Sequence, residues 1–107
     1  MPRLIRVASL SDIPEGGALC VRVGDEPVGL FRSEGQIYAL GDRCTHVGAP
    51  LSEGVVHAGE VECPLHDARF DLATGRALSG PAPLDTPVYR VRLAGDDVLI
   101  EEPAALS

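Results

Sequence analysis

Two short boxes, each with one cysteine and one histidine, constrain this 107-residue chain more than any other feature. The first box holds Cys44 and His46 with one residue between them, and the second holds Cys63 and His66 with two between them. Thiolate and imidazole are the groups that bind zinc or an iron–sulfur cluster. We therefore interpret these four residues as the ligands of one metal centre.

The spacing within the boxes leaves two kinds of centre open. A common zinc pattern pairs cysteine with cysteine and histidine with histidine, whereas each box here is mixed. Mixed boxes suit two metal ions side by side, with one iron bound by both cysteines and the other by both histidines. A zinc site that stabilises a binding module is the alternative, and colour separates the two, because a zinc protein is colourless.

Longer motifs surround both boxes. Residues 44–48 read Cys-Thr-His-Val-Gly and residues 63–66 read Cys-Pro-Leu-His, with connecting segments at 51–54, 69–71 and 74–75. In these segments the chain resembles the Rieske ferredoxin family. The resemblance implies one Rieske-type [2Fe–2S] cluster per chain, with Cys44, His46, Cys63 and His66 as both cofactor-binding and metal-ligating residues.

Short segments with β patterns predict an all-β fold for the rest of the chain. The expected strands cover residues 4–7, 18–23, 28–32, 36–40, 88–93 and 98–101, and one helical turn is expected at 11–15. Residues 42–83 are instead rich in Gly, Pro, Cys and His, and poor in long periodic runs. So long an irregular stretch in a compact domain needs something to order it, and a metal centre would do so.

The resemblance also implies how the chain is organised. We expect one Rieske domain over residues 1–107, with an antiparallel β-sandwich base formed by about 1–41 and 84–103. A small cluster-binding subdomain, about 42–83, is inserted into this base. Residues 80–83 read Gly-Pro-Ala-Pro and are similar to the proline loop that covers the cluster in relatives.

Residues near the boxes indicate a low reduction potential. Where high-potential relatives carry an extra disulfide this chain has Ala49 and Leu65, and where they carry Ser and Tyr hydroxyls it has Ala68 and Phe70. Hydrogen bonds to the cluster sulfurs stabilise the added negative charge and raise the potential. Without them we expect the low end of the Rieske range, roughly −150 to +300 mV.

The charge balance indicates which classes of partner the protein can bind. The chain has 16 acidic and 9 basic residues, a formal charge of −7, so phosphate backbones repel it and nucleic acid is not expected as a partner. No run approaches the roughly 18 apolar residues of a membrane span, and the N-terminal residues do not resemble a signal peptide. We therefore expect a cytoplasmic protein whose charge either favours basic protein partners or only keeps it soluble. We also expect a monomer.

The resemblance is closest to the ferredoxin components of bacterial ring-hydroxylating, non-haem iron oxygenase systems. It implies an electron carrier and not an enzyme, with a flavin-dependent reductase and a terminal oxygenase as partners. Val47, Leu65 and Pro81 would form a small docking patch over the cluster. The alternative is a small redox subunit of another enzyme, such as a nitrite reductase.

Several remaining residues have ordinary explanations. We expect Cys20 to be a buried free thiol, because it lies in the middle of a predicted strand, and His57 to be a surface residue near a hairpin turn. Asp67 and Arg69 flank the second box and either contact a partner or form an ion pair. For Asp42 and Arg43, which precede the first box, the same two roles are possible: contact with a partner or an ion pair.

Overall fold

The chain folds into three antiparallel β-sheets. The computed structural model describes residues 3–43, 49–64, 68–79 and 85–101. Within these ranges it contains strands and two short 3-10 helices, η1 (Leu10–Asp12) and η2 (Leu51–Glu53), and no α-helix. The predicted all-β fold is therefore confirmed. No helix in the described part of the chain has the length and apolar character needed to cross a membrane.

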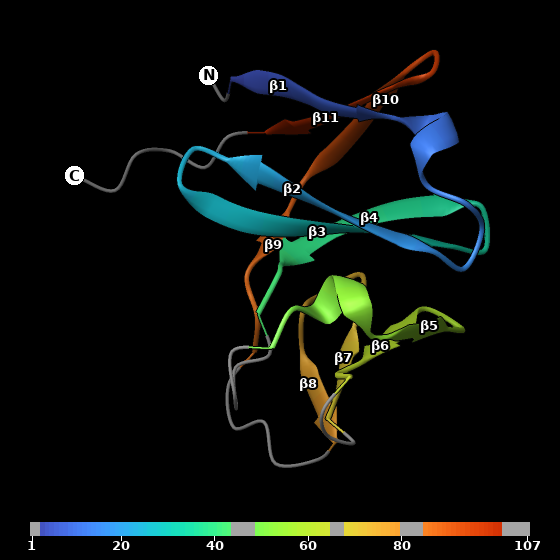
Figure 1. The fold of residues 1–107 in the computed structure, drawn as a ribbon, viewed down its shortest axis with the longest axis vertical. Coiled ribbons are helices and arrows are strands. Elements are labelled where there is room, and N and C mark those ends of the chain that lie inside the picture. Colours follow the sequence, from blue (N-terminus) through green and yellow to red (C-terminus); the bar gives the residue numbers. More distant parts are fainter. Residues whose placement is uncertain (1–2, 44–48, 65–67, 80–84, 102–107) are drawn as a thin grey trace.

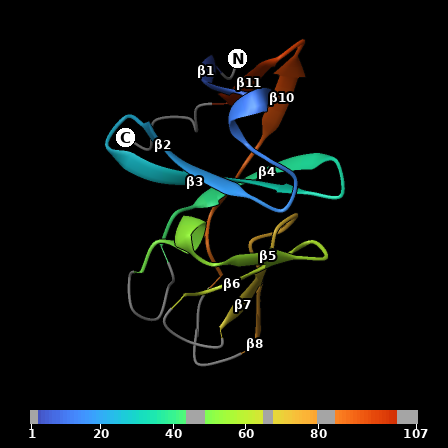
Figure 2. The same ribbon diagram turned by 45° about the vertical axis from the view of Figure 1, so that its right-hand side comes forward.

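The three sheets follow one another along the molecule (Figure 1; Figure 2). The terminal sheet has the order β1 (Leu4–Ser9), β11 (Asp97–Glu101), β10 (Val91–Ala94). The central sheet has the order β2 (Ala18–Val23), β3 (Glu26–Ser33), β4 (Gln36–Gly41), β9 (Val88–Tyr89). The small sheet has the order β5 (Val55–His57), β6 (Glu60–Glu62), β7 (Arg69–Asp71), β8 (Ala77–Ser79).

The central sheet is covered on both faces, which explains the apolar character of β3. Side chains of successive residues in a strand point to opposite faces. Leu30 therefore packs with Val98 and other residues of the terminal sheet. Phe31, the next residue, packs with Phe70 and other residues of the small sheet. The central sheet thus takes part in two separate hydrophobic cores.

The predicted strands in the first half of the chain are confirmed. The expected strand at 18–23 coincides with β2, and those at 4–7, 28–32 and 36–40 fall within β1, β3 and β4. The helical turn expected at 11–15 is present one residue earlier, as η1. The strand expected at 98–101 is β11.

Two expectations need correction. The segment 42–83 is more regular than its sequence pattern indicates, because it contains η2 and the four strands of the small sheet. Each of these strands has three residues, too few for an alternating pattern to be recognised. The single strand expected at 88–93 is divided at Arg90, where the chain passes from the central sheet to the terminal sheet.

The segment between β4 and β9 leaves and re-enters the central sheet at neighbouring points. Leu40 on β4 pairs with Val88 on β9. The Gly41 amide donates a hydrogen bond to the Pro87 carbonyl, with 2.8 Å between N and O. The whole small sheet is thus attached through two adjacent antiparallel strands. Where the base ends and the inserted subdomain begins stays a prediction.

Candidate metal centre

The four predicted ligands are unequally covered by the structure. Cys63 directly follows β6 and is described, whereas Cys44, His46 and His66 lie outside the described residues. Within the described ranges no group of three or more His, Cys, Asp or Glu side chains is placed to hold a metal ion. With three predicted ligands beyond those ranges, this finding leaves the four-residue site untested.

Cys63 is buried in an apolar core. The residue is 3% exposed and belongs to the core between the central and small sheets, with Val61, Ala68 and Phe70. Its backbone N–H donates to the Ala68 carbonyl at 2.8 Å, which closes the base of the loop that carries His66 in the sequence. A thiol fixed in a dry core is shielded from solvent and from oxidants.

Hydrogen bonds between described residues also flank the other two segments that the resemblance assigns to the centre. Asp42 precedes residues 44–48 and Ser52 follows them. The Asp42 carboxylate accepts two hydrogen bonds from Ser52, each with a donor–acceptor distance of 2.6 Å. After residues 80–84, the Asp85 carboxylate accepts the Ala77 amide at 2.9 Å. The described residues therefore form a frame with hydrogen bonds across the base of each loop.

Thr86 joins this frame to the central sheet. Its amide donates to the Gly75 carbonyl at 2.8 Å, and its hydroxyl donates to the Gly41 carbonyl at 3.1 Å. Gly75 has φ of +73°, and a Cβ at that position would collide with the Thr86 carbonyl. Glycine is thus required there both by the backbone conformation and by the close approach of Thr86.

Ala68 and Phe70 have side chains without hydrogen-bonding groups, and both are fully buried. Phe70 lies on β7, and Ala68 directly precedes that strand. Neither can give a hydrogen bond to a cluster sulfur, as the sequence already indicates. The low potential inferred from these two residues stays a prediction.

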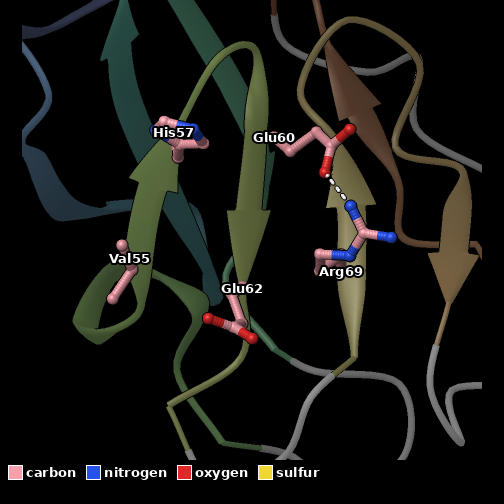
Figure 3. A pocket seen from close by; sticks show the side chains of 5 residues that line it. All are labelled: Val55, His57, Glu60, Glu62 and Arg69. Carbon is pink, nitrogen blue, oxygen red and sulfur yellow. Dashed lines mark hydrogen bonds and ion pairs between the residues drawn. The ribbon is translucent and has the colours of Figure 1, made fainter.

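The outer face of the small sheet carries a shallow pocket of about 230 Å³ (Figure 3). Its lining is Val55, His57, Glu60, Glu62 and Arg69. Arg69 forms an ion pair with Glu60, with 2.6 Å between Nη1 and Oε1. Arg69 thus forms an ion pair with a residue of the neighbouring strand; Asp67 lies outside the described residues, so the two roles considered for Asp67 and Arg69 stay open. His57 is exposed, as expected, directly before the β5–β6 turn.

The expected burial of Cys20 is wrong. Cys20 is exposed, because it lies on the face of β2 opposite to Leu19 and Val21. Partial burial of its sulfur and, after that, the Asp42 carboxylate raise the pKa of the Cys20 thiol to about 11. Strand alternation could have indicated this, because β2 buries its other face against the terminal sheet.

The donor set fits an iron–sulfur centre. Two thiols and two imidazoles can hold a [2Fe–2S] cluster with mixed ligation. Cys63, the donor that the structure describes, is buried and lies at the base of a closed loop.

Comparisons with known proteins identify the family. The family model described as the Rieske [2Fe–2S] domain matches residues 3–90. The chain is 42% identical to the naphthalene 1,2-dioxygenase system ferredoxin component of Pseudomonas aeruginosa, over 91% of this chain and 93% of that protein.

Two solved structures agree with this match. The ferredoxin of carbazole 1,9a-dioxygenase from Nocardioides aromaticivorans IC177 has a TM-score of 0.87 and 35% identity, covering 92% of this chain and 96% of that chain. A chain in the complex of reduced oxygenase and oxidised ferredoxin in carbazole 1,9a-dioxygenase has a TM-score of 0.86 and 33% identity, covering 97% of both chains. The cofactor of such proteins is a Rieske-type [2Fe–2S] cluster, which favours iron over the zinc alternative. The chain belongs to the Rieske [2Fe–2S] domain family, as the extent of these matches shows, and its three antiparallel sheets and buried Cys63 agree with this.

Proposed function

We propose that the protein is the ferredoxin component of a non-haem iron oxygenase system. It carries one electron at a time from a flavin-dependent reductase to a terminal oxygenase, and it is not itself an enzyme. The observation that carries this proposal is the extent of the match. The chain covers 93% of a relative that is a ferredoxin component, at 42% identity.

The proposal assigns the cluster ligands to Cys44, His46, Cys63 and His66. When bound, the cluster stores one electron. Two thiolates neutralise the doubly positive oxidised core, whereas four would leave it negative, so an electron enters the mixed site at lower cost. The buried position of Cys63 supports its place in this set.

The residues around Cys63 exclude water and set the potential. The side chains of Ala68 and Phe70 are fully buried and apolar, so these side chains bring no hydrogen bond to a reduced cluster. The hydrogen bond from the Cys63 amide to the Ala68 carbonyl occupies a donor that would otherwise be available to a nearby acceptor. These residues favour a potential at the low end of the Rieske range.

We further propose that residues 42–83 form the cluster-binding subdomain and that 1–41 and 84–103 form the base. The strands of the small sheet all lie between residues 55 and 79, and those of the other two sheets lie outside this range. The hydrogen bond between Gly41 and Pro87 brings the two proposed boundaries together. These arrangements support the division.

Electrostatic attraction would guide the carrier to its partners. The formal charge of −7 favours encounter with basic protein surfaces. One solved relative is in a complex of reduced oxygenase and oxidised ferredoxin, which supports an oxygenase partner for this chain. The docking residues proposed from sequence, Val47, Leu65 and Pro81, lie outside the described residues. Turnover that does not change between about 0.05 M and 0.5 M salt would contradict steering.

A monomer in the cytoplasm is part of the proposal. The exposed Cys20 thiol, which forms no disulfide, suits a reducing compartment. Gel filtration of the purified protein should give the size of a single 11.2 kDa chain. Co-purification as a stable complex would instead favour a subunit of another redox enzyme, such as a nitrite reductase.

Protein-film voltammetry with iron analysis tests the central proposal. We expect a reddish-brown protein with about two irons per chain and a reversible one-electron wave near the low end of roughly −150 to +300 mV. A colourless protein that contains zinc would overturn the cluster assignment. A wave at high positive potential would overturn the role given to Ala68 and Phe70 and, with it, the oxygenase ferredoxin.

A further inference from the structure

Asp42 is a buried carboxylate with two short hydrogen bonds. It directly follows β4 and is 3% exposed. One carboxylate oxygen accepts the Ser52 backbone N–H at 2.6 Å, and the other accepts the Ser52 hydroxyl at 2.6 Å. Burying a carboxylate costs free energy unless hydrogen bonds compensate for the lost water, so this pair is built into the fold.

The central sheet makes room for this carboxylate. A Cβ at Gly29 on β3 would lie 3.0 Å from Asp42 Oδ1 and 2.7 Å from the Phe31 ring. The Asp42 backbone is also fixed, because its N–H donates to the Pro27 carbonyl at 3.0 Å. The Asp42 side chain therefore has a defined position on the central sheet. The carboxylate is close enough to the Cys20 thiol to raise its pKa.

The position of this pair in the sequence relates it to the metal centre. Asp42 precedes Cys44 by two residues, and Ser52 follows the segment that contains Cys44 and His46. The hydrogen bonds between them close the base of that segment. Covalent geometry keeps the Cα atom of Cys44 within about 7 Å of that of Asp42.

We propose that Asp42 is a positioning residue for the cluster: paired with Ser52, it fixes the first ligand loop and sets a negative charge beside the centre. The inference rests on the ligand assignment of the proposed function. A buried negative charge on a residue next to the first ligand box would disfavour the addition of an electron to the cluster. The Ser52 hydroxyl donates to this charge and so reduces its effect on the cluster.

Two substitutions should move the reduction potential in opposite directions. Asp42→Asn removes the charge while keeping the shape, so we expect a higher potential. Ser52→Ala removes the hydroxyl donor but keeps the backbone N–H, so the carboxylate acts more strongly and we expect a lower potential. General damage to the loop gives no reason for opposite signs.

The measurement is film voltammetry of the loaded protein, with the g-values of the reduced cluster from electron paramagnetic resonance and iron content per chain. Asp25→Asn is the matched control, because Asp25 is exposed in the β2–β3 turn and the change in net charge is the same. We expect wild-type potential and g-values for this control. Ser52→Thr keeps the hydroxyl and should restore the wild-type potential.

The outcomes separate this inference from the proposed function. Wild-type protein without a Rieske signal would overturn both. A wild-type signal with Asp42→Asn and Ser52→Ala indistinguishable from Asp25→Asn would overturn the positioning role and leave the electron carrier intact. If Asp42→Asn does not fold, Ser52→Ala and Ser52→Thr still decide, and equal potentials in those two variants would contradict the role of the pair.

Discussion

The two cores on either side of the central sheet are built differently. The buried residues of the core against the terminal sheet are all aliphatic, with Tyr89 packed against them. The core against the small sheet contains Phe31, Phe70 and the predicted ligand Cys63. Strands β2 and β3 have six and eight residues, whereas each strand of the small sheet has three.

This difference separates two sources of stability. Long paired strands with a continuous apolar face can fold through burial alone. A sheet of three-residue strands has few ladder hydrogen bonds and depends on what it encloses. In the sequence, the segments that carry the predicted ligands precede β5 or connect β6 to β7, so we expect metal binding to contribute to the folding of this sheet. We expect the small sheet to lose its structure before the other two.

The largest effect should come from Cys63→Ser, which removes a proposed ligand but changes little volume. We expect loss of the cluster and of amide hydrogen-exchange protection in β5–β8, with protection retained in β3 and β11. Cys20→Ser is the matched control and should keep both iron and protection. A Cys63→Ser protein with full iron content would contradict the ligand assignment and the dependence of the small sheet on metal.

Truncation in each core compares them directly. Phe70→Ala should lower the free energy of unfolding by about 3–5 kcal/mol, and Ile100→Ala, in the other core, by about 2–5 kcal/mol. In a urea titration, we expect the Phe70→Ala protein to release iron at a lower urea concentration than the one at which the circular dichroism signal of the strands is lost. Ile100→Ala should keep these two events together. Coincident transitions in both variants would mean that the two cores unfold as one unit.

The smallest effect concerns Cys20, at the edge of the core that faces the small sheet. With its pKa raised to about 11, the thiol should react slowly with iodoacetamide near neutral pH and faster as pH approaches 11. The unfolded thiol, with its ordinary value of 9.0, ionises first, so this contribution to stability is lost as pH rises from about 9 to 11. Alkylation at the rate of an ordinary exposed thiol at pH 8 would contradict this assignment.

The sequence allowed most of the fold to be predicted where strands are long. Alternation over residues 18–23 identifies β2 correctly because six residues show the period clearly. The same pattern over 88–93 could not reveal the break at Arg90, since alternation continues while the hydrogen-bonding partners change from β4 to β11. Strands such as Glu60–Glu62 are too short to carry a pattern at all.

The candidate site was predicted through its chemistry. The mixed boxes predict four ligands and indicate a family; of these four, the structure describes Cys63, which is buried, and the full set stays a prediction. The pairing of Asp42 with Ser52 could not be predicted, because a carboxylate and a hydroxyl ten residues apart have no sequence signature. The exposure of Cys20 was missed because a cysteine in a strand is more often buried, although alternation places it opposite Leu19.

The pairing of β4 with β9 has a consequence for protein engineering. Neighbouring strands lie about 5 Å apart, so a segment that starts at one and ends at the other has both attachment points already side by side. The entropic cost of closing such a segment rises only slowly with its length, by about 0.6 kcal/mol for each doubling. Exchange of the residues between Gly41 and Pro87 for a short turn should therefore leave the core of the terminal sheet in place, but it would uncover Phe31 and Leu40 on the other face of the central sheet.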